Sequence, residues 1–353
     1  AMQIESYHAT MNLYKAGDLD YMGDSTSPPP EYIPFLKTKE DYRRFFYLAT
    51  YWYELNTKKP PVDNPLVRRA LNLSIDKQQL IDKITQGNQL PATHYVPDFV
   101  GLGYADAVKA DRAAGTDPFS TPDTVFNPEG ARAMLAEAGY PVEKTDDGYR
   151  ARGFPPLEIL YNTSEGHKAI AVAVQDMWKR HLGVSVTLQN QEWKVMLKNV
   201  RDGNFQVVRF GWVGDFNHAH TWLDTFMSTS PNNRTGWAEP GFDQAVRTAA
   251  ATADPKESIR LYRQAEKMAV DGMPKIPLYF YTKQTLVKPW VLGFEGNARN
   301  LQLVKWFAID PDRHVRKDDA GPAIPDEEFP PFGRIAPEPA SCCDPSKGQG
   351  GAP

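Results

Sequence analysis

The segment NFQVVRFGWVGDFN, residues 204–217, combines side chains that could bind a ligand. It is an apolar run of β-forming residues with a guanidinium at Arg209, a flat aromatic surface at Trp212 and two glycines that leave the backbone accessible. Asp215 adds a carboxylate just after the run. Open α/β sheets bind ligands beyond the carboxyl ends of their strands, so this pattern indicates a ligand site at Asp215.

A simpler interpretation places Asp215 at the start of a helix near His218, because Asp is a common N-cap. Composition alone favours that cap. The surrounding order of elements favours the ligand site, because it predicts a β-α-β-α-β unit with three parallel strands. Its strands and helices are, in chain order, Leu157–Asn162, Glu165–Leu182, Val184–Gln189, Trp193–Val200 and Phe205–Trp212. Asn162, Asn190 and Asp215 would then fall on one edge of a sheet.

Composition excludes several classes of protein. A net charge of −4 along 353 residues gives no electrostatic case for binding nucleic acid or an anionic membrane. No apolar run approaches the roughly 18 residues that a membrane span needs. The two cysteines, Cys342 and Cys343, are adjacent in a Pro/Ser/Gly-rich tail, so no framework of disulfides supports the fold.

Two other parts of the chain are informative. Residues Tyr42–Leu55 read as a long aromatic strand whose alternation places Trp52 and Glu54 on one face, where the carboxylate needs a partner. Residues Leu90–Val125 read as a long irregular connection, which is typical of functional or disordered loops. Aromatic and amide side chains gather near the predicted strand ends: Tyr47, Trp52, Asn162, Trp193, Trp212 and Tyr279. Such a set is typical of a binding pocket, although each member alone is as often core.

Enzymatic motifs are absent from the sequence. There is no nucleophile elbow, zinc-protease helix, phosphate-binding loop or dinucleotide fingerprint. His218 and His220 could share a metal ion only from a strand or loop, and a solvent-exposed pair is the favoured interpretation. Three carboxylates, Glu54, Glu192 and Asp215, could meet in space as a hydrolase pair would require, but nothing in their spacing singles them out. We therefore predict no catalysis, no metal and no cofactor.

Several long segments resemble the oligopeptide-binding proteins of bacterial ABC importers. The resemblance runs from about Ala9 to about Ile309 and keeps its order, so it is more specific than a short motif. The segments that carry it are PPVDNPLVRRALNLSIDKQQLI, FNPEGARAMLAEAGY, LYNTSEGHKAIAVAVQDMWKRHLGVSV, LQNQEWKVMLKNVRDGNFQVVRFGWVGDFN and IPLYFYTKQTLVKPWVLGF.

The resemblance implies an α/β fold of the two-lobed, class II periplasmic-binding-protein type, which closes on an extended peptide. Asp215 stands where the family binds the α-ammonium group of the peptide, and the strand around Gly211, Trp212 and Val213 stands where the family pairs with the peptide backbone. The residues at or beside positions that line the family's side-chain pockets are Tyr47, Trp52, Glu54, Asn162, His167, Trp193, Arg209 and Tyr279.

The same resemblance implies a function and a location. The chain would bind short peptides in the periplasm or another extracytoplasmic space and deliver them to a membrane ABC permease. A different interpretation is a truncated interaction or scaffold protein that keeps the binding lobe without a role in transport. A hydrolase built from the acids named above is a third.

Three departures from the family affect these expectations. Ala49 and Val213 stand where the best-known members have a disulfide, and Val200 stands where some relatives have an arginine for the C-terminus of the peptide. The first two-fifths or so of the family pattern is missing, so self-association or a separate N-terminal partner is expected. The implied domains are residues 1–48, the end of the first lobe; 49–282, a complete second lobe; 283–310, a return to the first lobe; and 311–353, a disordered tail.

Overall fold

A computed structural model describes residues 6–23 and 27–311 of the chain. Nearly all of the tail predicted for 311–353, including both cysteines, lies outside the described residues. The chain divides into a large unit, Leu48–Thr282, and a small unit formed by Ala1–Tyr47 and Lys283–Pro353. Strands β2 (Tyr42–Leu55) and β9 (Lys275–Val287) each contain one of the two boundaries. No helix among the described residues is long and apolar enough to cross a membrane.

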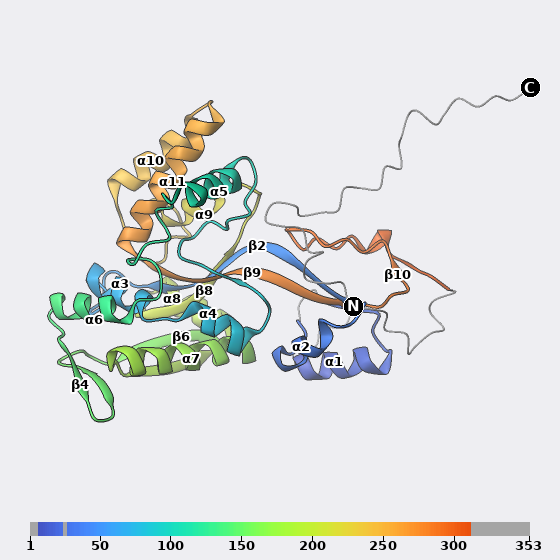
Figure 1. Ribbon diagram of the computed structural model, residues 1–353, viewed down its shortest axis with the longest axis horizontal. Coiled ribbons are helices and arrows are strands. Elements are labelled where there is room, and N and C mark those ends of the chain that lie inside the picture. The colour runs from blue at the N-terminus through green and yellow to red at the C-terminus, as the bar shows by residue number, and fades with distance from the viewer. Residues whose placement is uncertain (1–5, 24–26, 312–353) are drawn as a thin grey trace, which may run out of the picture. The chain divides into compact units, whose positions relative to one another are not determined.

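The main sheet of the large unit has the strand order β9-β2-β8-β6-β7. Strand β6 pairs in parallel with both β7 and β8, and β2 pairs antiparallel to β8. The predicted β-α-β-α-β unit is therefore confirmed (Figure 1). Its elements are β6 (Leu157–Asn162), α7 (Glu165–Leu182), β7 (Val186–Gln191), α8 (Trp193–Arg201) and β8 (Val207–Val213).

Local sequence signals set the ends of helix α7. The side chain of Ser164 accepts a hydrogen bond from the backbone of His167 at the first turn. Gly183 ends the helix at φ 70°, a left-handed conformation that suits glycine. Between these ends, Ile170, Val174 and Trp178 form a buried stripe with helical spacing. The helix therefore forms where the sequence predicts it and covers the sheet with its apolar face.

Other helices of the large unit follow the same rules. Most of them begin at side-chain caps such as Asn64, Asp76 and Asp254. Their bounds are α3 (Pro65–Leu73), α4 (Lys77–Leu80) continued by a π-helical turn (Ile81–Thr85), α6 (Pro128–Glu137), α9 (His220–Leu223), a 3-10 turn (Asp224–Phe226), α10 (Pro240–Ala251) and α11 (Pro255–Gly272). A hairpin of β4 (Val142–Thr145) and β5 (Gly148–Ala151) lies between α6 and β6.

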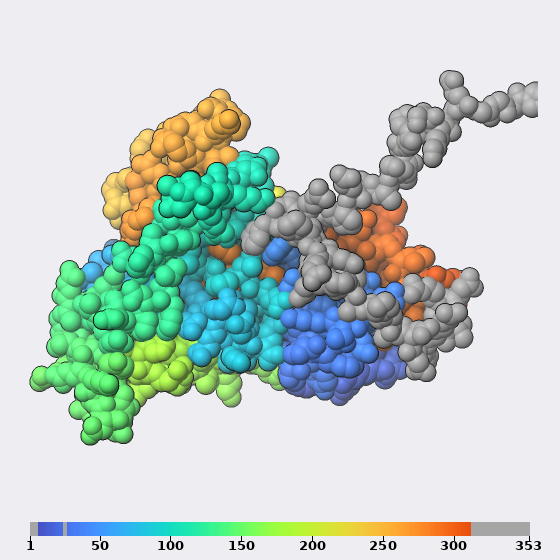
Figure 2. Space-filling view, in the orientation of Figure 1, coloured from blue at the N-terminus to red at the C-terminus, as the bar shows by residue number. Residues whose placement is uncertain are grey.

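The segment Leu90–Val125 is less irregular than predicted. It contains the short strand β3 (Leu90–Pro91) and the helix α5 (Tyr104–Ala114), which ends at Gly115 with φ 68°. An ion pair of 2.6 Å joins Asp111 of α5 to Arg263 of α11. Figure 2 shows α5 on the same face of the large unit as α10 and α11. The segment is therefore packed structure rather than a free loop.

The small unit has its own apolar core. Its elements are α1 (Tyr7–Ala16), β1 (Tyr21–Met22), a 3-10 turn (Pro30–Tyr32), α2 (Ile33–Leu36), parts of β2 and β9, β10 (Val291–Leu292), a second 3-10 turn (Val304–Trp306) and β11 (Ala308–Ile309). Met11, Tyr14, Ile33 and Leu286 are among its buried core residues. The predicted closing segment from Leu301 to Ile309 is a strand only in its last two described residues, which pair with β10.

Candidate functional site

Strand β8 extends well past the strand beside it. Its register with β6 pairs Ile159 with Val207 and Leu160 with Val208, and no further pair follows. Asn162, the last residue of β6, therefore lies level with Phe210 rather than with Asp215. The three strand ends share the carboxyl edge of the parallel strands, as predicted, but β8 continues further than β6, because a parallel pattern does not fix how far each strand continues.

The overhanging part of β8 has a defined hydrogen-bonding direction. On the β2 side, the amide of Gly214 donates to the carbonyl of Leu48 at 2.8 Å, which makes Val213 and Ala49 a non-hydrogen-bonded pair. By the alternation of an antiparallel ladder, Gly211 and Val213 point their N–H and C=O groups away from β2. No described strand pairs with them on that side. These groups form a short open edge within the sheet.

Gly211 is required for this geometry. A Cβ atom at this position would lie 2.8 Å from the carbonyl oxygen of Thr50, which is closer than real Cβ atoms approach backbone. A side chain here would push β8 away from β2. The glycine therefore keeps the two strands paired up to the open edge.

Asp215 lies beyond the end of β8 and is exposed. Its backbone amide donates to the hydroxyl oxygen of Thr221 at 3.1 Å, and that hydroxyl donates to Oδ2 of Asp215 at 3.3 Å. The indole N–H of Trp212 donates to the same hydroxyl oxygen at 3.1 Å. Helix α9 begins after Ala219 without any side-chain cap, so the interpretation of Asp215 as a helix cap is wrong.

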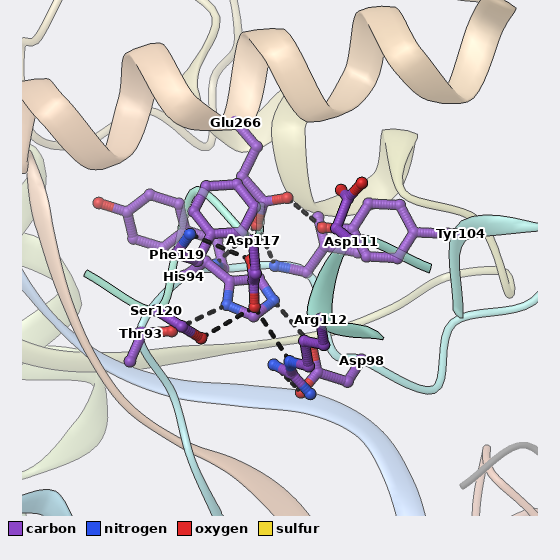
Figure 3. Close-up of polar contacts among 12 residues, drawn as sticks. Thr93, His94, Asp98, Tyr104, Asp111, Arg112, Asp117, Phe119, Ser120 and Glu266 are labelled. Carbon is purple, nitrogen blue, oxygen red and sulfur yellow. Dashed lines mark hydrogen bonds and ion pairs between the residues drawn. The ribbon is translucent and has the colours of Figure 1, made fainter. Parts of the chain in front are cut away.

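The turn that carries Asp215 is also tied to the segment before α5. The side-chain oxygen of Asn217 accepts a hydrogen bond of 2.8 Å from the amide of Gly101. A mostly buried group of charged and polar side chains, here called the His94 network, fixes that segment (Figure 3). Its members are His94, Asp98, Tyr104, Asp111, Arg112, Asp117, Arg263 and Glu266.

Contacts within the His94 network link α5, its flanking loops and α11. The carboxylate of Asp98 lies 3.0 Å from Nε2 of His94 and forms an ion pair of 2.9 Å with Arg112. Glu266 of α11 accepts from the backbone amides of Tyr95 and Val96 at 2.8 and 2.7 Å. The structure thereby gives the Asp215 turn a rigid support on the side of Gly101.

Arg209 lies on the opposite face of β8 from Trp212, among neutral groups. Its guanidinium donates to the side-chain oxygen of Asn162 at 3.3 Å and to the hydroxyl of Tyr281 at 3.1 Å. It also lies 4.7 Å from the ring centroid of Tyr51. Every partner that the structure gives this cation is uncharged, so the site can accept an anion.

Electrostatics separate the two basic groups of this site. Burial lowers the pKa of Arg209, but the phenols of Tyr281, Tyr51 and Tyr279 raise it more, so the pKa lies above its usual value. Burial and the charge of Arg209 lower the pKa of His167 to about 2. The imidazole Nδ1 of His167 lies 3.4 Å from the hydroxyl of Tyr51. At neutral pH the site therefore holds one cation and one neutral imidazole.

Three predicted pocket residues lie in the interior instead. Trp52 and Glu54 are fully buried on the face of β2 opposite Arg209, where the indole N–H of Trp52 donates to Glu54 at 3.1 Å. Lys275 completes this cluster at 3.6 Å from the carboxylate, which confirms that Glu54 needs a partner. Tyr279 is 4% exposed and stacks on Tyr51. In the described structure these side chains contact protein, not an open surface.

The remaining predicted residues lie at different places. Trp193 begins α8 with 43% of its surface exposed and contacts Phe210, so it can meet a ligand. Tyr47 belongs to the small unit, where Lys283 lies 5.2 Å from its ring centroid. His218 and His220 both contact the ring of Tyr262, and no group of three potential metal ligands occurs among the described residues.

The three carboxylates of the hydrolase interpretation have separate roles in the structure. Glu54 is enclosed, and Glu192 caps α8 by accepting from the amides of Lys194 and Val195. Glu192 and Asp215 are both exposed, each just beyond the end of a different strand. Glu54 is enclosed, so it cannot form a carboxylate pair with either of them across an open substrate position.

Sequence reasoning missed Thr221, Tyr51 and Tyr281. Thr221 follows Asp215 by six residues, a spacing that no common motif describes. Tyr51 stands one residue before Trp52, so the strand period places it on the face of Arg209, and that alternation was the available signal. Tyr281 reaches Arg209 from a strand distant in sequence.

Comparison with known proteins identifies the class. Residues 2–234 match the family described as bacterial extracellular solute-binding proteins, family 5, middle part. The chain belongs to this family, whose members bind solutes rather than catalyse reactions. The fold of the aligned part is that of the periplasmic peptide-binding proteins.

Several relatives are described as peptide-binding proteins. The periplasmic oligopeptide-binding protein OppA of Salmonella typhimurium is 34% identical over 86% of this chain and 54% of its own length. The periplasmic murein peptide-binding protein MppA of Escherichia coli has the same identity and coverage. The crystal structure of Haemophilus influenzae OppA in complex with RPPGFSPFR superposes with a TM-score of 0.73 at 32% identity, over 87% of this chain and 57% of that one. The chain thus spans about half the length of the relatives it matches.

Proposed function

We propose that this chain binds short peptides in extended form, with the free amino terminus at Asp215 and the backbone along the open edge of β8. The observation that carries the proposal is the overhang of β8 past Val208, which leaves Gly211 and Val213 with outward N–H and C=O groups. A peptide strand placed there would form main-chain hydrogen bonds that are independent of its sequence. The peptide-binding relatives support the same assignment.

Charge at the two ends of the site fits a peptide with free termini. Asp215 supplies a carboxylate just past the strand, where an α-ammonium group would form a charge-assisted hydrogen bond. Arg209, further back along the same strand, supplies a cation whose protein partners are neutral. A carboxylate of the peptide, either terminal or in a side chain, would complete that site.

Side chains around the open edge would tolerate many sequences. Trp193, Val213 and Phe216 expose 43, 45 and 49% of their surfaces. Apolar surfaces of this kind favour burial of a peptide side chain without demanding a particular partner. We infer a broad preference for short peptides rather than recognition of a single sequence.

The proposal includes delivery. A family of extracellular solute-binding proteins and relatives described as periplasmic support an extracytoplasmic location and transfer of the peptide to an ABC-type permease. Self-association, or a second polypeptide that covers the exposed Asp215, would strengthen the binding further, because excluding water strengthens charge pairing.

Calorimetric titration with a tripeptide and its N-acetylated form tests the proposal. We expect the free-amine peptide to bind at least about tenfold more tightly, the scale of one hydrogen bond between charged groups. Asp215→Asn should remove most of this difference. Asp202→Asn is a matched control, because it removes the same charge from an exposed position at the end of α8. Equal binding of the two peptides by the unmodified protein would refute the role of Asp215.

A further inference from the structure

The side chain of Thr221 contacts both Trp212 and the carboxylate of Asp215. It is 4% exposed and lies in the short helix α9, six residues after Asp215. Its hydroxyl oxygen accepts from the indole of Trp212 and from the amide of Asp215, each at 3.1 Å. The hydroxyl donates a hydrogen bond to Oδ2 of Asp215 at 3.3 Å.

These three contacts use the full hydrogen-bonding capacity of a hydroxyl group, which has one donor and two acceptor positions. The amide of Asp215 donates to the Thr221 hydroxyl, and that hydroxyl donates to the carboxylate of the same Asp215. The two hydrogen bonds close a small ring. Rotation of the Asp215 side chain would break that ring. A hydroxyl with no spare capacity therefore holds the carboxylate in one orientation.

The backbone on both sides of this hydrogen-bonded ring is held by close contacts. A Cβ atom at Gly214 would lie 2.5 Å from the ring of Trp222, so the backbone of the turn is in close contact with a fully buried indole. Beyond Asp215, the side chain of Asn217 accepts from Gly101 at 2.8 Å. The turn is thus fixed before and after Asp215, and Thr221 fixes its side chain.

We propose that Thr221 is the positioning residue of the amine anchor, which orients the Asp215 carboxylate and couples it to Trp212. The inference rests on the proposed function, because it assumes that Asp215 receives the amino terminus of the peptide. Thr221 itself does not touch the ligand. Its effect on binding must therefore pass through Asp215 and disappear when Asp215 is neutral.

The test compares Thr221→Val, which removes the hydroxyl at nearly constant shape, with Thr221→Ser, which keeps it. We expect Thr221→Val to weaken binding of a free-amine tripeptide about three- to tenfold, the range of coupling between neighbouring groups. Thr221→Ser should bind within about twofold of the unmodified protein. Binding of the N-acetylated peptide should change less than about twofold in both variants.

A double-mutant cycle separates positioning from a general structural role. In an Asp215→Asn background, Thr221→Val should have no further effect on peptide affinity. Thr221→Ala provides a second hydroxyl-free variant if Thr221→Val unfolds at the assay temperature. Loss of affinity that persists with Asp215→Asn, or with the acetylated peptide, would overturn the inference.

A measurement without peptide checks the contact to Trp212. The proton NMR signal of the Trp212 indole N–H can be assigned by its loss in Trp212→Phe. This signal should shift in Thr221→Val and keep its position in Thr221→Ser. An unchanged signal in Thr221→Val would overturn the coupling. If the unmodified protein binds no free-amine peptide, the proposed function fails and this inference fails with it. If that protein distinguishes free from acetylated peptides but Thr221→Val does so equally well, only the positioning role fails.

Discussion

Lys275 and Glu54 form an ion pair inside the large unit, and replacing Lys275 with Met should destabilise that unit strongly. Both side chains have no exposed surface, and Nζ lies 3.6 Å from Oε1. The ammonium group also donates to the carbonyl and hydroxyl of Thr225 at 3.2 and 2.9 Å. It lies 4.0 Å from the ring centroid of Phe226 and 4.4 Å from that of Trp52. Methionine is unbranched and only one atom shorter than lysine, so the change tests mainly the charge.

The magnitude follows from what remains around Glu54. Its carboxylate keeps the indole of Trp52 at 3.1 Å and the guanidinium of Arg234 at 3.5 Å. Removing one partner of a buried ion pair costs about 3–5 kcal/mol, because the other charge stays buried. Arg234 is still present but 24% exposed, so it compensates only in part. We expect a loss near the lower end, about 3 kcal/mol.

Urea unfolding followed by circular dichroism measures this loss. The double variant Lys275→Met/Glu54→Leu should recover to within about 1 kcal/mol of the unmodified protein, because it removes both buried charges. Lys267→Met is a matched control, since its ion pair with Asp271 is exposed and should contribute less than about 1 kcal/mol.

Two outcomes would refute this reasoning. The first is a Lys275→Met protein that unfolds at the same urea concentration, with an unchanged slope, as the unmodified protein. The second is a double variant whose loss of stability equals or exceeds the sum of the two single losses, which would mean that no favourable coupling joins the pair. Either result would show that solvent or another group compensates Glu54.

Two further predictions concern pH and the support of the Asp215 turn. The pKa of His167 is about 2 in the folded protein, lowered by burial and by Arg209, against 6.5 as its ordinary value. Below about pH 6.5, His167 binds a proton in the unfolded chain but not in the folded chain. The free energy of unfolding therefore falls as the pH drops below about 6.5. His167→Gln should reduce that fall, as measured by urea midpoints between pH 7 and pH 4. Glu266→Gln should lower the free energy of unfolding by about 1–3 kcal/mol, because the NH2 group of the new side chain would face the Tyr104 hydroxyl. Hydrogen exchange at the backbone amide of Tyr95 should become faster. Unchanged exchange would contradict the supporting role of Glu266.

The crossover unit could be predicted from sequence because its signals are local. Ser164 and Gly183 set the two ends of α7, and apolar residues repeat between them with helical spacing. Two such helices between three apolar strands leave parallel pairing as the ordinary solution. The position of Asp215 just after the third strand follows from the same local order, so the residue most relevant to the site was accessible to sequence reasoning.

Relations between distant segments could not be predicted in this way. The overhang of β8 depends on its register with β6, which the alternating pattern does not fix along the strand direction. Burial of Glu54 depends on Lys275, far along the chain. Helix α5 was missed because Pro, Gly, Asp and Thr dominate its flanks, although Gly115 marks its end. The overhang of β8 and the burial of Glu54 depend on contacts that only the folded chain creates, whereas α5 had a local signal at its end.

The open edge of β8 has a consequence for how this protein can evolve. A ligand held by the N–H and C=O groups of Gly211 and Val213 is held by atoms that almost every point mutation leaves in place. Neighbouring side chains such as Trp193 and Phe216 can then change, and the range of accepted ligands can drift while the mode of attachment is inherited. Proline at either strand position is one exception, because it would delete a donor. Any side chain at Gly211 is another, because its Cβ would lie 2.8 Å from the carbonyl oxygen of Thr50. Selection on ligand preference and selection on attachment thus act on different atoms.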